Sequence, residues 1–79
     1  MRLTFNSKYN IAYLRLREEG EEVETVRVSE ELNIDLAPDG SVYGIEFLNA
    51  NEQLSQADSG LLEIVNEASG EAARIKLTG

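Results

Sequence analysis

Apolar residues recur at every second position through most of the N-terminal part of the chain. This period of two is typical of β-strands that bury one face and expose the other, whereas an amphipathic helix repeats every 3.6 residues. Along residues 11–17, for example, one face carries Ala12, Leu14 and Leu16. The pattern therefore predicts a series of antiparallel β-hairpins.

Five strands are expected in this part of the chain. They are residues 2–5, 11–17, 23–28, 32–36 and 42–48. The strongest turn signal is Pro38-Asp39-Gly40, because proline presets φ for a turn and Asp-Gly supplies positive φ. The acidic segment 18–22 is centred on Gly20 and has no apolar residue except at its flanks, which predicts a solvated turn. It lacks the ligand spacing of an EF-hand loop.

The pattern changes after residue 48. A short helix is expected over residues 49–55, with Asn49 or Asn51 as its cap. A final short strand is expected near the C-terminus, because apolar residues again alternate with basic ones there. The apolar positions are Ala73, Ile75 and Leu77, and the basic ones are Arg74 and Lys76.

Between these two elements, the apolar spacing predicts a second helix. Its apolar side would consist of Leu61, Leu62, Ile64, Val65 and Ala68. Asp58 and Ser59 would cap its start and Gly70 would stop it. A strand at residues 61–65 is the alternative that this spacing leaves open.

Together these elements predict one α+β domain, mostly β, over residues 1–79. It is expected to be an antiparallel meander of about five strands with a C-terminal helix or hairpin packed on one face. Residues 1–55 would form the meander, and residues 56–79 an extension of a helix followed by a short strand. A single sheet must cover its apolar face with a helix or a second copy of itself, so a β extension favours dimerisation.

Composition narrows the setting and the partners. With Cys 0 the chain has no disulfide framework, which indicates a reducing, cytoplasmic compartment. The N-terminus lacks the apolar region of a signal peptide, and no apolar run is long enough to span a membrane. A formal charge of -8 repels phosphates and anionic headgroups, so neither nucleic acid nor membrane is expected as a partner.

The residue types needed for most catalysis are missing. With His 0 and Cys 0, nucleophilic triads and ordinary zinc sites cannot form within the chain. We therefore expect no enzyme, no catalytic or metal-binding residue and no cofactor. The alternative is a carboxylate-based, Mg- or Ca-dependent enzyme that uses Asp35, Asp39 and Glu46, with Asp35 and Glu46 facing each other across the predicted hairpin.

The most distinctive exposed residues are expected on the strand at residues 11–17. They are Ile11, Tyr13, Arg15 and Arg17. Tyrosine and arginine are over-represented where proteins anchor one another, so this set is the candidate partner-binding site. The competing interpretation is that these arginines pair with acidic residues across the sheet.

Three segments carry a family resemblance. They are Ala12-Tyr13-Leu14-Arg15-Leu16 after an aromatic and polar turn, then Asp39-Gly40, then Gly44-Ile45-Glu46. Over roughly its first 55 residues the chain resembles domain of unknown function 2283, a family of small prokaryotic proteins. It departs from the family at Asn6 and Asn10, where members usually carry acids, and at Pro38, which interrupts an Asp-rich approach to the hairpin.

The resemblance implies a compact β-meander and a bacterial or archaeal cytoplasmic setting, and it brings no established activity, cofactor or catalytic residue. Members that sit beside small toxin-like genes suggest an antitoxin role by analogy, and an acidic protein suits a basic toxin. We therefore expect a noncatalytic interaction domain. It would bind another protein, in particular a basic one, or itself as a homodimer, through its sheet surface or an edge strand.

Overall fold

The computed structural model describes residues 1–18, 20, 22–55 and 60–77 of the chain. Its elements, in chain order, are β1 (Arg2–Asn6), β2 (Ile11–Arg15), β3 (Glu24–Ser29), β4 (Leu32–Leu36), β5 (Val42–Leu48), α1 (Ala50–Ser55), β6 (Leu61–Val65) and β7 (Ala72–Lys76). Glu19 and Glu21 of the acidic turn, and the expected caps Asp58 and Ser59, lie outside the described residues.

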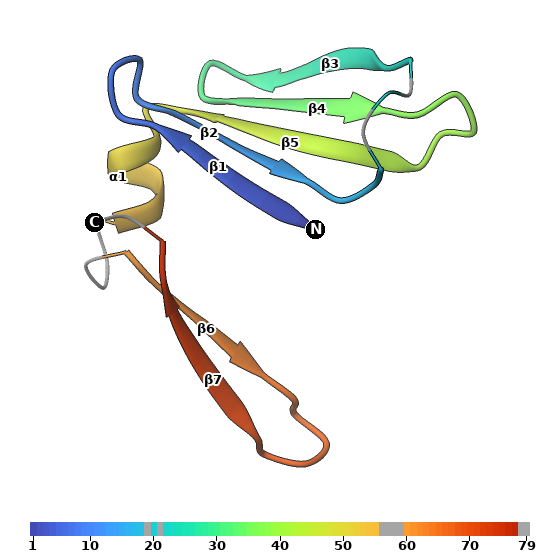
Figure 1. Cartoon of the computed structure of the whole chain (residues 1–79). Helices are drawn as coiled ribbons and strands as arrows, with labels where there is room; N and C mark the ends of the chain where they lie inside the picture. Colours follow the sequence, from blue (N-terminus) through green and yellow to red (C-terminus); the bar gives the residue numbers. More distant parts are fainter. Residues whose placement is uncertain (19, 21, 56–59, 78–79) are drawn as a thin grey trace.

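The first five strands form one antiparallel sheet in the order β1-β2-β5-β4-β3, which Figure 1 shows as a twisted layer. The expected five-strand, mostly β architecture is confirmed. Strands β3, β4 and β5 follow one another as a meander, and β2 pairs with β5 rather than with β3. The β1–β2 hairpin is thereby joined to the meander, and β1 and β3 are the two edges of the sheet.

The predicted turn between β4 and β5 is confirmed. Gly40 has a φ of 86° and donates its backbone N–H to the carbonyl of Ala37 at 2.9 Å. The Ala37 N–H in turn donates to the carbonyl of Ser41 at 2.8 Å. Gly20, at the centre of the acidic turn, also has positive φ, at 103°. Both glycines therefore occupy backbone conformations that L-residues rarely adopt.

The short helix α1 begins where it was expected, but its main side-chain cap comes from a distant turn. The backbone N–H of Asn51 donates to Oδ1 of Asn10 at 2.8 Å, and the N–H of Ala50 donates to the Asn10 carbonyl at 3.0 Å. Asn10 Nδ2 also donates to the side chains of Asn49 and Asn51. Asn10 therefore ties the β1–β2 turn to the start of the helix.

The helix predicted from Leu61 is wrong, and the strand alternative is what the structure contains. Strands β6 and β7 pair as an antiparallel hairpin. Gly70, expected to stop a helix, lies in the connecting turn with a φ of 77° and donates its N–H to the carbonyl of Asn66 at 2.8 Å. A spacing that fits one helical face also fits a short apolar strand, and the pairing of two such segments decides between them.

The hairpin of β6 and β7 extends away from the five-strand sheet (Figure 1). All ten residues of these two strands are exposed. The prediction that a C-terminal element packs on one face of the sheet is therefore met, among the described elements, only by α1, which contacts β2. The sheet is left as a single layer.

Candidate functional site

Strand register separates the sheet into two chemically different faces. One row of directly paired residues, Leu3, Leu14, Ile45, Ile34 and Val26, crosses all five strands. A second row consists of Phe5, Ala12, Phe47 and Leu32. These nine residues point to the same side of the sheet and are called the apolar face. The residues between them point to the other side, which we call the polar face.

Within the part of the chain that the structure describes, the apolar face is covered at one end, by α1. Ala12, at 0% exposure, lies on β2, which contacts α1, and Ala50 in the helix is likewise 0% exposed. At the sheet edges, by contrast, Phe5 is 36% and Val26 40% exposed. No leucine, isoleucine, valine or phenylalanine among the described residues is buried. The side chains that should form a core are thus half-buried or exposed.

The hairpin of β6 and β7 has an apolar face of its own. Leu62 is paired with Ile75, and Ile64 with Ala73, so these four residues share one side. We call them the hairpin apolar face. Leu62 is 43%, Ile64 49% and Ile75 50% exposed. A two-stranded hairpin is marginally stable by itself in water, so this face needs a packing partner.

The polar face is organised around Tyr13. Its hydroxyl donates to Asp35 Oδ2 at 2.7 Å, and the Thr25 hydroxyl donates to Asp35 Oδ1 at 2.6 Å. The Tyr13 ring reaches across Gly44, where an added Cβ would overlap the ring. Beside this close approach, the β4–β5 register shifts between Asp35 and Leu36.

Burial raises the pKa of the Tyr13 hydroxyl above its ordinary value, and the hydrogen bond to Asp35 raises it further. The charges of Asp35 and Glu46 and the neighbouring Tyr43 act in the same direction. Tyr13 therefore stays a neutral hydrogen-bond donor over the physiological pH range. Its hydrogen bond to Asp35 links β2 to β4, and the Thr25 hydroxyl links the same carboxylate to β3.

The other two carboxylates of the predicted metal set belong to separate networks. Glu46 Oε1 accepts a hydrogen bond from Asn33 Nδ2 at 2.9 Å, directly across the β4–β5 pair. Asp39, in the turn, accepts from the Ser41 backbone N–H at 3.0 Å and pairs with Arg17 Nη1 at 3.3 Å. Hydrogen bonds from Ser41, and then the Arg17 charge, hold the pKa of Asp39 below its ordinary value.

Asp35 and Glu46 lie on the same face but do not face each other as expected, because Asp35 pairs with Gly44 and Glu46 with Asn33. Among the described residues, no three or more carboxylates lie close enough together to hold a metal ion. The alternative set of Asp35, Asp39 and Glu46 is therefore not brought together as one site.

Three of the four predicted partner-binding residues share one face of β2, and the fourth lies beyond the end of the strand. Ile11, Tyr13 and Arg15 lie on β2 and alternate with Ala12 and Leu14, which places them on the polar face. Arg17 follows the strand and contacts the β4–β5 turn through Asp39 and Ser41. All four are half-buried. That they bind a partner stays a prediction.

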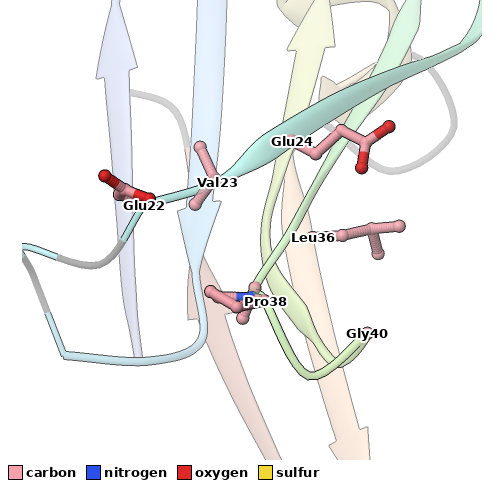
Figure 2. A pocket seen from close by; sticks show the side chains of 7 residues that line it. Glu22, Val23, Glu24, Leu36, Pro38 and Gly40 are labelled. Carbon is pink, nitrogen blue, oxygen red and sulfur yellow. The ribbon is translucent and has the colours of Figure 1, made fainter.

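A shallow hollow lies where the chain enters β3, beside the β4–β5 turn (Figure 2). It is lined by Glu22, Val23, Glu24, Leu36, Ala37, Pro38 and Gly40. The carboxylates of Glu22 and Glu24 point in opposite directions, away from Val23 (Figure 2). The hollow thus combines apolar walls with two carboxylates that do not converge on a common point, as a pair of carboxylates acting on one substrate would.

Among the residues that the structure describes, no helix has the length and apolar character needed to cross a bilayer.

Comparison with known proteins gives one finding. A family model described as "Protein of unknown function (DUF2283)" matches residues 2–51, from β1 into α1, and leaves β6 and β7 outside. No curated protein and no solved structure is significantly similar to the chain.

Proposed function

The chain belongs to the DUF2283 family of proteins of unknown function, as its sequence features suggested, and from that premise we propose that it is a noncatalytic protein-interaction domain whose binding surface is the apolar face of the sheet. The observation that carries the proposal is the exposure of that face. Rows of apolar side chains cross the sheet, and among the described elements α1, which contacts β2, is the one that covers them, at one end.

Large contiguous apolar surfaces are uncommon on monomeric proteins and mark interaction sites where they occur. The polar face offers a weaker surface, because Tyr13 already donates to Asp35 and Arg17 already pairs with Asp39. Binding through the apolar face requires no catalytic group, in keeping with a chain that has His 0 and Cys 0. The absence of cysteine also suits a reducing, cytoplasmic setting.

The net charge of -8 would affect mainly the rate at which a partner associates. Exposed carboxylates around an apolar contact steer a basic partner and speed its encounter, while the apolar contact supplies most of the affinity. An antitoxin-like role against a basic protein is one form of this proposal, and self-association is the other.

Two adjacent substitutions on β3 test the proposal. Val26 is on the apolar face and 40% exposed, while Arg27 alternates onto the polar face. Val26→Asp and Arg27→Ala each lower the net charge by about one unit, so they match in charge and differ in the face they change. Circular dichroism establishes that both variants keep the sheet.

The wild type and both variants are tagged and used to capture partners from cells of the native host, and each captured protein is purified and titrated. We expect a stoichiometric partner, or a second copy of the chain, to bind Arg27→Ala like the wild type and Val26→Asp at least about tenfold more weakly. Equal binding to a folded Val26→Asp, or loss of binding only in Arg27→Ala, would move the surface to the polar face.

A further inference from the structure

The accessible surface of the chain is too large for a compact protein of its mass. It amounts to 5894 Å². Folded monomers follow a scaling of surface with mass that gives about 4,800 Å² for this chain. The excess, about 1,100 Å², exceeds the roughly 800 Å² that each partner buries in a standard stable interface. One chain alone therefore exposes enough surplus surface to form a specific dimer.

Two exposed apolar surfaces that match each other in character contribute to the surplus. The apolar face of the sheet is partly open, and the hairpin apolar face is exposed on both strands. The hairpin apolar face is aliphatic, the apolar face of the sheet is aliphatic apart from Phe5 and Phe47, and neither face has a charged residue within its paired rows. A sheet and a hairpin that pack face to face would form the second layer that the sheet lacks.

We propose that the apolar face binds the β6–β7 hairpin of a second copy of this chain, so that two copies exchange hairpins reciprocally. The inference rests on the proposed function and names its partner. Each chain carries one apolar sheet face and one hairpin apolar face. A two-fold symmetric exchange therefore covers both faces of both copies and leaves none open to a third copy. The chain's own hairpin extends away from its sheet (Figure 1).

The exchange also covers more apolar surface than direct stacking of two sheets would. A sandwich made from the two apolar faces alone would leave Leu62, Ile64 and Ile75 of both hairpins in water. Residues 60–77 include Arg74 and Lys76, which contribute two of the seven basic residues of an acidic chain. The same segment carries three acidic residues, Glu63, Glu67 and Glu71, and Arg74 pairs with Glu63 at 2.9 Å, so its net charge is -1. Residues 1–55 carry five basic and eleven acidic residues, a net charge of -6. Docking the hairpin on the sheet of a second copy therefore opposes less like charge than stacking two sheets would.

The first test uses two neighbouring residues of β6 that differ in the face they occupy. Ile64 belongs to the hairpin apolar face, whereas Val65 points to the opposite side, and they are 49% and 47% exposed. Ile64→Asp and Val65→Asp each add one negative charge in place of a β-branched side chain of similar exposure. Sedimentation velocity on the full chain is expected to give a dimer for the wild type and Val65→Asp, and at least a tenfold weaker dimer for Ile64→Asp.

The second test identifies which surfaces meet. Because the chain has no native cysteine, single cysteines can be introduced without competition. Chains with Ile34→Cys are mixed with chains with Ile64→Cys and oxidised. We expect a covalent dimer between the two kinds of chain. Preferential linkage of Ile34→Cys chains to each other would indicate a sheet sandwich. A chain that carries both cysteines is oxidised separately, and an internal disulfide in its monomer would indicate a hairpin folded on its own sheet. Either outcome overturns the exchange.

These results separate the inference from the proposed function. A wild type that stays monomeric in sedimentation overturns the hairpin exchange, whether or not the protein binds something else. If such a monomer binds a different protein in a manner that Val26→Asp abolishes, the proposed function stands without its dimer. If neither a second copy nor another protein requires Val26, both proposals fail.

Discussion

At the scale of single residues, Gly44 and Tyr13 form one unit. The Tyr13 ring occupies the space above Gly44 that any other residue would fill with its Cβ, and from there its hydroxyl reaches Asp35 on β4. An aromatic ring over a cross-strand glycine shields backbone that would otherwise be exposed and holds the strand register. The glycine is required by the neighbour's side chain, since its own backbone does not have positive φ.

Gly44→Ala is therefore expected to displace the Tyr13 ring and break its hydrogen bond to Asp35. We expect a loss of about 1–3 kcal/mol in the free energy of unfolding, the usual cost of overpacking. Urea denaturation measures the loss. In a Tyr13→Ala background the same substitution should cost much less, because the clash has been removed. Equal costs in both backgrounds would show that the ring does not require the glycine.

A second residue-scale prediction concerns Asp39. Its pKa is lowered in the folded state mainly by hydrogen bonds from the Ser41 side chain and backbone, with Arg17 adding to the effect. A lowered pKa means that the turn gains stability above the unfolded pKa of about 3.9 and loses that gain as the pH falls through the folded value. Ser41→Ala should raise the Asp39 pKa toward its ordinary value.

Carboxyl carbon NMR titration of Asp39 measures this change. Ser69→Ala is a matched control, because Ser69 makes a comparable turn contact with the Glu71 N–H in the other hairpin. The control should leave the Asp39 titration unchanged. An Asp39 pKa that stays low in Ser41→Ala would assign the effect to the backbone N–H of residue 41 and to Arg17, rather than to the serine hydroxyl.

At the scale of elements, the start of α1 depends on the β1–β2 turn. Asn10 has a φ of 57° and accepts hydrogen bonds from two backbone N–H groups at the helix start. A six-residue helix has little stability of its own, so it needs such an external cap. The side-chain amide of Asn10 also donates, to Asn49 and to Asn51.

Asn10→Ala removes both the cap and a residue that tolerates positive φ, whereas Asn10→Gly removes only the cap. We expect Asn10→Gly to lower the free energy of unfolding by about 1 kcal/mol and Asn10→Ala by about 2–3 kcal/mol. Urea denaturation of both variants checks the order. Equal stability of the two would contradict the backbone part of this account, and wild-type stability in Asn10→Gly would contradict the cap.

At the scale of the whole molecule, the chain is more extended than its length requires. Its radius of gyration is 13.9 Å, whereas compact domains of this length have about 11.6 Å. The difference reflects the projecting hairpin and the single-layer sheet. A protein with so few buried side chains gains most of its stability from whatever covers the apolar face.

The melting temperature should therefore depend on protein concentration. If dimerisation covers the apolar face, a tenfold rise in concentration stabilises the folded dimer by mass action, and the midpoint is expected to rise by a few degrees. Circular dichroism melts over a wide concentration range measure this. In Ile64→Asp the midpoint should become independent of concentration. A concentration-independent wild type would mean that the chain is stable without a second copy.

The sequence alone determined the five strands of the sheet, the β4–β5 turn, the short helix and the family. These follow from local causes: a period of two, the backbone preferences of Pro38 and Gly40, and motifs read along the chain. The segment from Leu61 was mispredicted because a short apolar run fits both periods, and only its pairing with residues 72–76 makes it a strand.

Tertiary structure alone decided the strand order, the cap from Asn10 and the separation of Asp35, Glu46 and Asp39, because each depends on residues far apart in the chain. It also decided the candidate site. Alternation identified apolar residues such as Leu14 and Ile34 without showing whether anything covers them. Cover is a property of how elements pack in space, and in this chain the sheet and the hairpin each present an apolar face that the described fold leaves open.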